Sequence, residues 1–314
     1  MGSTVRSAEA APEAPPREEV PELRAANGRF AVLGDLQPTS RLEIWRESNA
    51  LERVLLVESV RRAEPDFVVL LGDAVFCGSS ASAWTEFDRL CRPLRDARLP
   101  VLPVLGNHEY WVSPAAALRR FFERFPDLGR RRWYARRYGP LGLVFLDSNR
   151  RWQSRRSWSA QRAWFERTLA DFDADARVRG VLVFLHHPPY TNSTVTSDEL
   201  HVQRDLVPPF ASARKTLALV AGHVHSYERY ARGGKTFVVA GGGGAPRVRL
   251  SMGDRRRHAD DLFEGPALRF FHFLEAAPTA GGVEVAVRGL EKGGTEADLR
   301  DRFLLGWPVA GAAR

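Results

Sequence analysis

The sequence predicts a layered α/β domain with one largely parallel sheet and a second, antiparallel sheet. Three observations predict this fold. Six short apolar runs alternate with stretches of helical pattern, which is typical of a parallel sheet covered by helices. Three later apolar runs follow one another without a long helix between them, which favours antiparallel pairing. The sequence shows no internal repeat and no clear second domain.

The strand candidates are continuous runs of apolar and β-branched residues of the length of buried strands. The six main candidates lie at Arg29–Leu33, Phe67–Leu71, Val101–Leu105, Leu141–Leu146, Val181–Leu185 and Thr216–Val220. The three later candidates lie at Thr236–Ala240, Arg269–Glu275 and Val283–Arg288.

Four stretches between the main strands have helical patterns. They lie at Glu47–Arg62, Trp84–Arg98, Ser113–Phe125 and Ser159–Asp173. In the third, Ser113 followed by Pro114 is suited to the N-cap and the first helical position.

The chain of 314 residues, 44% of them hydrophobic, is long enough for a core that needs no disulfide or metal staples. Residues 1–27 contain almost no large apolar side chains and are expected to form a flexible N-terminal tail. Residues 28–314 are then expected to form a single domain.

The composition excludes several classes of protein. No apolar run approaches the roughly 20 residues of a membrane-spanning helix, so no membrane association is expected. The tail lacks the apolar region of a signal peptide, and two cysteines are too few for a disulfide framework. These features fit either a cytoplasmic or an exported protein, and they leave the oligomeric state open.

Five of the six main strands end in a short polar motif. The motifs are Gly34-Asp35-Leu36-Gln37, Gly72-Asp73, Gly106-Asn107-His108-Glu109, His186-His187-Pro188 and Gly222-His223-Val224-His225. Ligands of open α/β sheets bind beyond the carboxyl ends of the strands, so the five motifs are expected to converge. A glycine precedes the key residue in four of them, which lets the backbone turn sharply into the site.

The converging side chains are a carboxylate, amide and imidazole set suited to borderline or hard divalent metals. The predicted ligands are Asp35, Gln37, Asp73, Asn107, His186, His223 and His225. Taken alone, each motif has an ordinary explanation, such as a turn for Gly-Asp. Their order and their common position at strand ends favour a metal site.

In this order the motifs resemble the signature of the calcineurin-like metallophosphoesterase superfamily. The segment from Ala221 to Arg229 is especially similar to the purple acid phosphatase branch. The resemblance runs from about Arg29 to Pro246, and it implies a four-layer α/β/β/α sandwich of two mixed β-sheets.

The resemblance also implies a centre of two divalent metal ions, Mn, Fe or Zn, bridged by Asp73. Asp35 and His225 would hold the first ion, and Asn107, His186 and His223 the second. Such a pair activates a hydroxide that attacks a phosphate ester. His108 would face the leaving-group oxygen as a proton donor or electrostatic stabiliser, so His108 and Asp73 are the predicted catalytic residues.

Two positions depart from the family pattern. Gln37 stands where most of the superfamily has histidine and the purple enzymes have glycine, although its amide oxygen can still bind a metal. Phe76 stands where the purple enzymes have the tyrosine that binds ferric iron and gives the colour. We therefore predict a protein that is not purple and that binds a less selective pair of divalent ions.

Two other histidines have open assignments. His187 could bind metal in place of His186, although the His-x-Pro spacing of the family favours His186. His201 could assist phosphate binding or be an exposed loop residue.

Arginine dominates the 46 basic residues, and the formal net charge is +8. Residues 119–137 hold eight arginines, and Arg150, Arg151, Arg155 and Arg156 follow. They could line a positive approach for polyanionic substrates or form a solvated surface.

Three functions are compatible with these features. The first is hydrolysis of monoesters on a phosphorylated small molecule or protein. The second is a phosphodiesterase or nuclease that binds nucleic acid through the arginine-rich segment and its aromatic residues. The third is a non-catalytic module that binds phosphate or nucleic acid.

Overall fold

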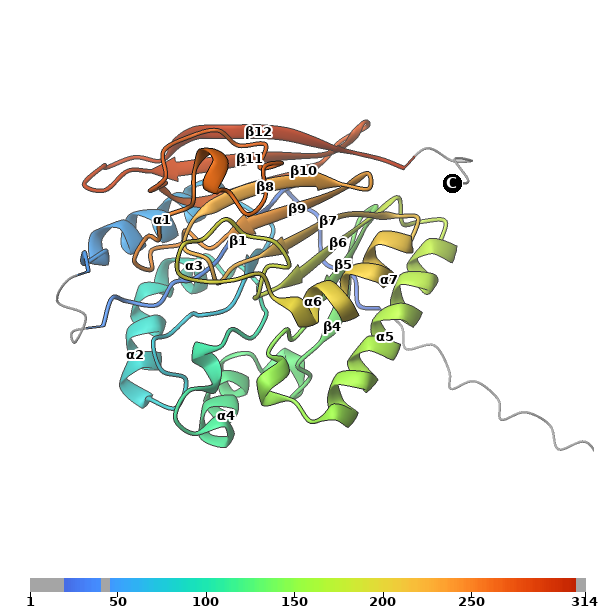
Figure 1. Ribbon diagram of the computed structural model, residues 1–314. Helices are drawn as coiled ribbons and strands as arrows, with labels where there is room; N and C mark the ends of the chain where they lie inside the picture. The colour runs from blue at the N-terminus through green and yellow to red at the C-terminus, as the bar shows by residue number, and fades with distance from the viewer. Residues whose placement is uncertain (1–19, 41–45, 309–314) are drawn as a thin grey trace, which may run out of the picture.

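The computed structural model describes residues 20–40 and 46–308, which form two stacked six-stranded mixed sheets (Figure 1). The strand order in the first sheet is β12 (Asp298–Gly306), β11 (Gly282–Leu290), β10 (Phe271–Pro278), β1 (Phe30–Leu33), β2 (Val68–Leu70) and β3 (Val101–Pro103). The order in the second is β4 (Tyr134–Tyr138), β5 (Leu141–Phe145), β6 (Gly180–Leu185), β7 (Thr216–Ala221), β9 (Lys235–Ala240) and β8 (Tyr227–Arg232).

Helices cover the outer faces of the two sheets. The chain forms α1 (Ala50–Arg62), α2 (Ala81–Leu90), α3 (Arg92–Asp96), α4 (Pro114–Arg124), α5 (Arg155–Ala174), α6 (Leu200–Asp205) and α7 (Val207–Ser212). Helix α1 packs on β10 of the first sheet and α7 on β7 of the second. Figure 1 shows α1 and α2 on one side of the molecule and α5 to α7 on the other. The four-layer sandwich of two mixed sheets is therefore confirmed.

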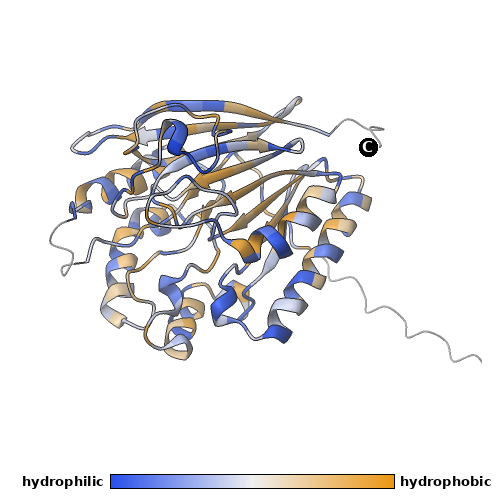
Figure 2. Ribbon diagram, viewed as in Figure 1, coloured by the Kyte–Doolittle hydropathy of each residue, from blue (hydrophilic) through white to orange (hydrophobic). Residues whose placement is uncertain are grey.

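The central strands are apolar because both of their faces are buried. In β6, Leu182 and Phe184 join the core between the sheets, whereas Val183 and Leu185 join the core beneath α5 to α7. Alternate residues of a strand point to opposite faces, so a strand between two cores reads as one apolar run. The central strands accordingly have predominantly hydrophobic colours in Figure 2.

The predicted division into a parallel and an antiparallel sheet was wrong. The six main strands separate into β1 to β3 in one sheet and β5 to β7 in the other, and each set is internally parallel. The later strand β9 extends the second set in parallel, while β10 and β11 add antiparallel strands to the first. A buried apolar run indicates that both faces of the strand are covered, but it does not indicate which sheet the strand joins.

Three strands were missed, and all three lie at a sheet edge. They are β4, with sequence YARRY, β8, with YERYAR, and β12, with DLRDRFLLG. Edge strands commonly carry charged side chains, which protect the unpaired edge from association with other chains. These polar sequences therefore lack the apolar run used to recognise the central strands.

The predicted helices are present with altered limits. The Trp84–Arg98 stretch divides at Cys91 into α2 and α3, with Pro93 in the first turn of α3. Ser113 occupies the N-cap position of α4, and Pro114 is the first helical residue, but the Ser113 side chain forms no capping hydrogen bond. The short helices α6 and α7 were not predicted. Within residues 20–40 and 46–308, no helix has the length and apolar character needed to span a bilayer.

Residues 20–27, which were predicted to belong to a flexible tail, contact the domain. The backbone N–H of Leu23 donates to the carbonyl of Arg137 at 2.7 Å, and Glu22 forms an ion pair with the Arg137 side chain. The backbone N–H groups of residues 26–28 donate to the Asp66 carboxylate. Residues 20–27 thus pair with the domain through backbone groups, which a composition-based prediction does not consider. Residues 1–19 lie outside the described part of the chain.

Candidate metal centre

The loops that follow β1, β2 and β3 meet those that follow β6 and β7 at the carboxyl ends of both sheets. The Asp35 carboxylate, after β1, accepts the backbone N–H of His223, after β7, at 2.9 and 3.1 Å. The Asp73 carboxylate, after β2, lies 3.3 Å from Nε2 of His186, after β6. These contacts join the two sheets at one buried site.

One group of donors gathers around Asp35, Asp73 and His225, whose ligand atoms lie within 4.8 Å of one another. Nε2 of His225 lies 3.6 Å from Asp35 Oδ1. The Gln37 amide nitrogen lies 3.4 Å from Asp73 Oδ2 and 3.2 Å from His225 Nε2. The residues predicted to hold the first ion therefore lie together, and the Gln37 side chain lies beside them.

A second group gathers around His186. Its Nε2 lies 3.0 Å from Asn107 Oδ1, 3.2 Å from His223 Nδ1 and 3.3 Å from Asp73 Oδ2. His187 lies beside this group, and the ligand atoms of His186, His187 and His223 are within 4.8 Å of one another. Asp73 contacts both groups, which is the position of a bridging ligand.

Backbone carbonyls orient two of the imidazoles. Nδ1 of His186 lies 2.7 Å from the Leu71 carbonyl, and Nδ1 of His225 lies 2.7 Å from the Pro246 carbonyl. A carbonyl oxygen only accepts, so each Nδ1 carries a proton and each Nε2 faces the centre. This orientation, with the second ring nitrogen held by an outer partner, is the usual one for metal-binding histidines.

The residues fit a pair of divalent cations. Two oxygen acceptors, Asn107 Oδ1 and Asp73 Oδ2, and the Nδ1 atom of His223 surround the same nitrogen of His186, and a proton there can bond only one of them well. The Gln37 Oε1 atom is buried without a hydrogen-bond partner. Half a turn about the last side-chain bond exchanges the amide oxygen and nitrogen, which would direct the oxygen at a cation beside Asp73 and His225.

The charges of the site also favour cations. Burial lowers the pKa of His223 to about 3 and that of His225 to about 4, so both rings are neutral at pH 7 and able to bind metal. Burial opposes charge on His186 as well, but the Asp73 and Asp35 carboxylates outweigh it and raise the pKa of His186 to about 9. Asp73 and Asp35 therefore favour positive charge beside them, although burial raises the pKa of Asp35 itself well above its ordinary value.

Three of the candidate ligands adopt left-handed backbone conformations. The φ angles are +59° at Asp35, +50° at Asp73 and +68° at His223. Such values are uncommon outside glycine and occur often at functional sites, where the surrounding structure holds them. The strain lies in the ligands themselves and not in the glycines before Asp35 and His223.

The glycines before Asn107 and His223 serve to let groups approach closely. A Cβ on Gly106 would lie 2.2 Å from Asp73 Oδ1, and a Cβ on Gly222 would lie 2.6 Å from Asp35 Oδ2. Any side chain there would displace a carboxylate of the centre. The expectation that these two residues turn the backbone is therefore replaced by a requirement for space.

His108 lies at the edge of the centre, with Nε2 3.8 Å from Asp73 Oδ2. Its Nδ1 donates to the Phe76 carbonyl at 2.6 Å. Its ring stacks on Trp111 with 3.6 Å between ring centroids. The ring is thus held from two sides, which leaves Nε2 beside the Asp73 carboxylate.

Residues 28–227 match the calcineurin-like phosphoesterase family. The chain belongs to this family. It is also 26% identical over 216 residues to the probable purple acid phosphatase 20 of Arabidopsis thaliana, a match covering 65% of this chain. The chain spans about half of the length of that relative, since the match covers 47% of it.

Solved structures share the calcineurin-like phosphoesterase fold. A dimetal phosphatase from Danio rerio superposes with a TM-score of 0.59 at 18% identity, covering 89% of this chain and 98% of that chain. GAP50 of Plasmodium, described as the anchor in the inner membrane complex, superposes with a TM-score of 0.68 at 14% identity, covering 90% of each chain.

Sequence reasoning gave no role to Glu109, although it ends one of the phosphoesterase motifs. Its fully buried carboxylate accepts the backbone N–H groups of Asp73 at 2.8 Å, Ala74 at 2.9 Å and Gly106 at 2.7 Å. It therefore fixes the loops after β2 and β3 to each other. The position of an acidic residue directly after Gly-Asn-His was the feature of the sequence that could have indicated a role for Glu109.

Ser148 was also missed. It follows β5, the one main strand for which no motif was recognised, and its hydroxyl contacts the His186-His187 pair. The polar Asp147-Ser148-Asn149 sequence directly after an apolar run was the available signal. His201, by contrast, lies on α6 with its Nδ1 3.1 Å from the Arg204 side chain, and no contact joins it to the centre in the described part of the chain.

Most arginines of residues 119–137 bind protein groups. The partners are Glu123 for Arg119, Ser79 for Arg120, Asp88 for Arg124, Asp147 for Arg132 and Glu22 for Arg137. These contacts give the arginines a structural role in linking loops and helices. The proposed arginine-rich approach for substrates stays a prediction.

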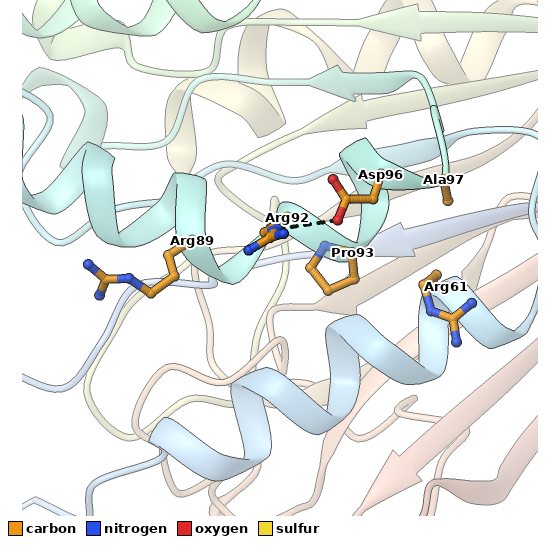
Figure 3. A pocket seen from close by; sticks show the side chains of 6 residues that line it. All are labelled: Arg61, Arg89, Arg92, Pro93, Asp96 and Ala97. Carbon is orange, nitrogen blue, oxygen red and sulfur yellow. Dashed lines mark hydrogen bonds and ion pairs between the residues drawn. The ribbon is translucent and has the colours of Figure 1, made fainter.

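A cavity of about 560 Å³ lies between the C-terminal end of α1 and the helices α2 and α3 (Figure 3). Its lining residues are Arg61, Arg89, Arg92, Pro93, Asp96 and Ala97. Helix α1 ends where the chain returns to the amino end of β2, so the cavity lies at the opposite end of that strand from the metal centre. Glu58 forms an ion pair with Arg61 at 2.6 Å, and Asp96 forms one with Arg92 at 3.3 Å. These ion pairs partly neutralise the positive charge of the cavity lining.

Proposed function

We propose that this protein is a metal-dependent phosphoesterase that hydrolyses phosphate monoesters. The observation that carries the proposal is the position of Asp73. One of its carboxylate oxygens lies 3.3 Å from His186, 3.4 Å from Gln37 and 3.8 Å from His108. A single oxygen thus connects the two donor groups and the candidate proton donor.

Two bound divalent ions would lower the pKa of a water molecule between them and neutralise the phosphoryl oxygens of the substrate. The protein's own residues would hold and orient the reacting groups. Asp73 lies between the two donor groups, and its Oδ2 atom lies 3.8 Å from Nε2 of His108. Because Nδ1 of His108 is engaged by Phe76, its Nε2 would deliver a proton to the leaving-group oxygen.

The relatives support the same chemistry. The Arabidopsis thaliana relative is described as a probable purple acid phosphatase, and the Danio rerio neighbour as a dimetal phosphatase. Neither description specifies a substrate for this chain. We infer the monoester preference from the phosphatase names and the two-centre geometry together.

Turnover of three substrates would test the proposal. The protein is loaded with Mn²⁺, Fe²⁺ or Zn²⁺ and given a chromogenic phosphate monoester, its bis-ester and single-stranded DNA. We expect the monoester to be hydrolysed fastest. Preference for the bis-ester or DNA would instead indicate a phosphodiesterase or nuclease. Phosphate binding with no hydrolysis of any ester would indicate a non-catalytic module.

Three variants connect this activity to the centre. Asp73→Asn, assayed with the chromogenic monoester, and His108→Ala, assayed with an alkyl phosphate whose leaving group needs a proton, are expected to lower kcat by about 10²–10⁴-fold without unfolding the domain. His223→Ala is expected to lose one of two bound ions, measured by elemental analysis. Asp96→Asn and His201→Ala are matched controls outside the centre. Unchanged rates and metal content in all three test variants would refute the assignment.

A further inference from the structure

His187 lies next to the metal centre without a role in the motif, because His186 occupies the ligand position. Its ring centroid lies 4.5 Å from that of His223 and 4.8 Å from that of His186. Unlike the fully buried His186, its side chain is only partly buried. A partly accessible imidazole beside the centre can either bind a metal or contact the substrate.

Ser148 decides which ring nitrogen of His187 carries the proton. The Ser148 hydroxyl oxygen lies 3.2 Å from the backbone nitrogen of His186 and 2.9 Å from that of His187, and both N–H groups donate to it. A hydroxyl has two lone pairs, so both are used. Its one proton is then available for Nδ1 of His187, which lies 2.9 Å away.

The proton on the neutral His187 ring therefore lies on Nε2. An imidazole binds a metal through an unprotonated nitrogen, and here the unprotonated nitrogen is Nδ1, which accepts from Ser148. His186 has the opposite arrangement, since its Nδ1 donates to a carbonyl and its Nε2 faces the centre. Two adjacent histidines thus present opposite nitrogens, one as an acceptor for a metal and one as a donor.

We propose that His187 is a substrate-binding residue whose Nε2–H donates to a non-bridging oxygen of the phosphoryl group, and that Ser148 positions it. No hydrogen bond joins Nε2 of His187 to another group within residues 20–40 and 46–308. This donor is therefore available to a ligand. The proposal rests on the phosphoesterase function, which supplies the phosphoryl oxygen.

A neutral donor suits this position. Phosphoryl oxygens carry charge throughout the reaction, and a fixed N–H directed at them stabilises that charge without competing with the metals for a lone pair. Removal of one such donor in other enzymes slows catalysis by about 10²–10³-fold. A ligand role predicts a different result, because loss of a ligand empties a metal position.

The first experiment compares His187→Leu and His187→Gln with His186→Ala. We expect both His187 variants to retain two ions per chain, and His186→Ala to lose one. The kcat/KM for a chromogenic monoester should fall by about 10²-fold in His187→Leu and less in His187→Gln, whose amide keeps an N–H. The inhibition constant for inorganic phosphate should rise in the same order. Loss of an ion from His187→Leu would overturn the proposal.

The second experiment reads the tautomer directly in zinc-loaded protein. Two-bond ¹H–¹⁵N correlation spectra distinguish protonated from unprotonated ring nitrogens, and His187 should show its proton on Nε2. Ser148→Ala should lose this preference and weaken phosphate inhibition, whereas Ser148→Thr, which keeps the hydroxyl, should preserve both. A proton on Nδ1 in the wild-type protein would overturn the proposal.

The two proposals fail in different ways. A wild-type protein that hydrolyses no ester would refute the phosphoesterase function. Binding of inorganic phosphate, measured by calorimetry in wild-type and His187→Leu protein, would still test the donor. Equal phosphate affinities in the two proteins, or unchanged kinetics in an active His187→Leu variant, would refute the role of His187 alone.

Discussion

The Glu109 carboxylate accepts the backbone N–H of Asp73 at 2.8 Å, so an acid from the loop after β3 holds the candidate bridging residue in the loop after β2. The same carboxylate accepts from Ala74 and Gly106. Asp73 has a φ of +50°, a conformation that aspartate seldom adopts without support. Glu109 therefore stabilises the strained backbone that directs the Asp73 side chain into the centre.

We predict that Glu109→Gln destabilises the protein and weakens metal binding. A glutamine offers one acceptor oxygen and turns an NH₂ group toward backbone donors, so at least one buried N–H loses its partner. The free energy of unfolding should fall by about 2–4 kcal/mol, and metal affinity by about 10–100-fold. Urea denaturation and metal competition measure the two effects. Glu123→Gln on the exposed face of α4 is the control, and equal results for both variants would contradict the prediction.

Trp111 is predicted to position His108 for proton transfer. The two rings stack with 3.6 Å between their centroids, and Trp111→Ala removes this stacking contact. We expect kcat for an alkyl phosphate, whose leaving group needs a proton, to fall by about 10–100-fold. The rate for nitrophenyl phosphate should fall much less because nitrophenolate leaves without protonation.

The leaving-group dependence separates this role from a general structural one. Trp111→Phe keeps an aromatic face and should restore most of the alkyl phosphate rate, and metal content should not change. Trp164→Ala on α5 is the control for loss of a partly buried tryptophan. Equal rate losses for the two substrates in Trp111→Ala would argue against the positioning of a proton donor.

The convergence of the predicted ligands could be read from the sequence because each one lies within four residues of the end of an apolar strand. Strands that run in parallel bring their carboxyl ends together, so Asp35, Asp73 and His223 converge whichever sheet each strand joins. Glu109 and Ser148 could not be assigned in this way. Apart from the contact of Glu109 with the nearby Gly106, they act on backbone groups 35 to 39 positions away in the chain, and such contacts exist only after folding.

The errors in the fold have a similar cause. Hydrophobicity identified the central strands because their residues are covered on both faces. It could not identify β4, β8 and β12, since these edge strands carry arginines and acids. It also could not divide the central strands between two sheets, because backbone pairing determines the sheet.

We predict that the iron-loaded protein shows no visible phenolate-to-iron absorption band. Phe76 has no phenolic oxygen, and its ring lies edge-on to His108 at 5.2 Å and to Trp111 at 5.4 Å. Tyr110, the nearest tyrosine in sequence to the Asn107 motif, donates its hydroxyl to Asp147 at 2.6 Å. Absorption spectra after loading with ferric and ferrous iron measure this directly. A visible band that disappears on reduction would contradict the prediction.

The last prediction concerns His272, a fully buried residue of β10 that is not a candidate metal ligand. Its Nδ1 lies 3.3 Å from the Phe270 carbonyl, and its Nε2 has no hydrogen-bond partner. Burial lowers the pKa of His272 to about 4, whereas an unfolded histidine has a pKa of about 6.5. The unfolded chain therefore binds a proton over a pH range in which the folded chain does not.

The stability that depends on this neutral ring is fully present above pH 6.5 and is lost as the pH falls from about 6.5 to about 4. The loss is about 1.4 kcal/mol for each pH unit within that range. We expect the free energy of unfolding of His272→Phe to fall less steeply than that of wild type between pH 7 and pH 5, measured by urea denaturation at fixed metal concentration. Metal release at low pH affects both proteins and cancels in the comparison. Phe273→Leu, a buried substitution with no titratable group, should lower stability by the same amount at every pH, and a wild-type slope in His272→Phe would contradict the prediction.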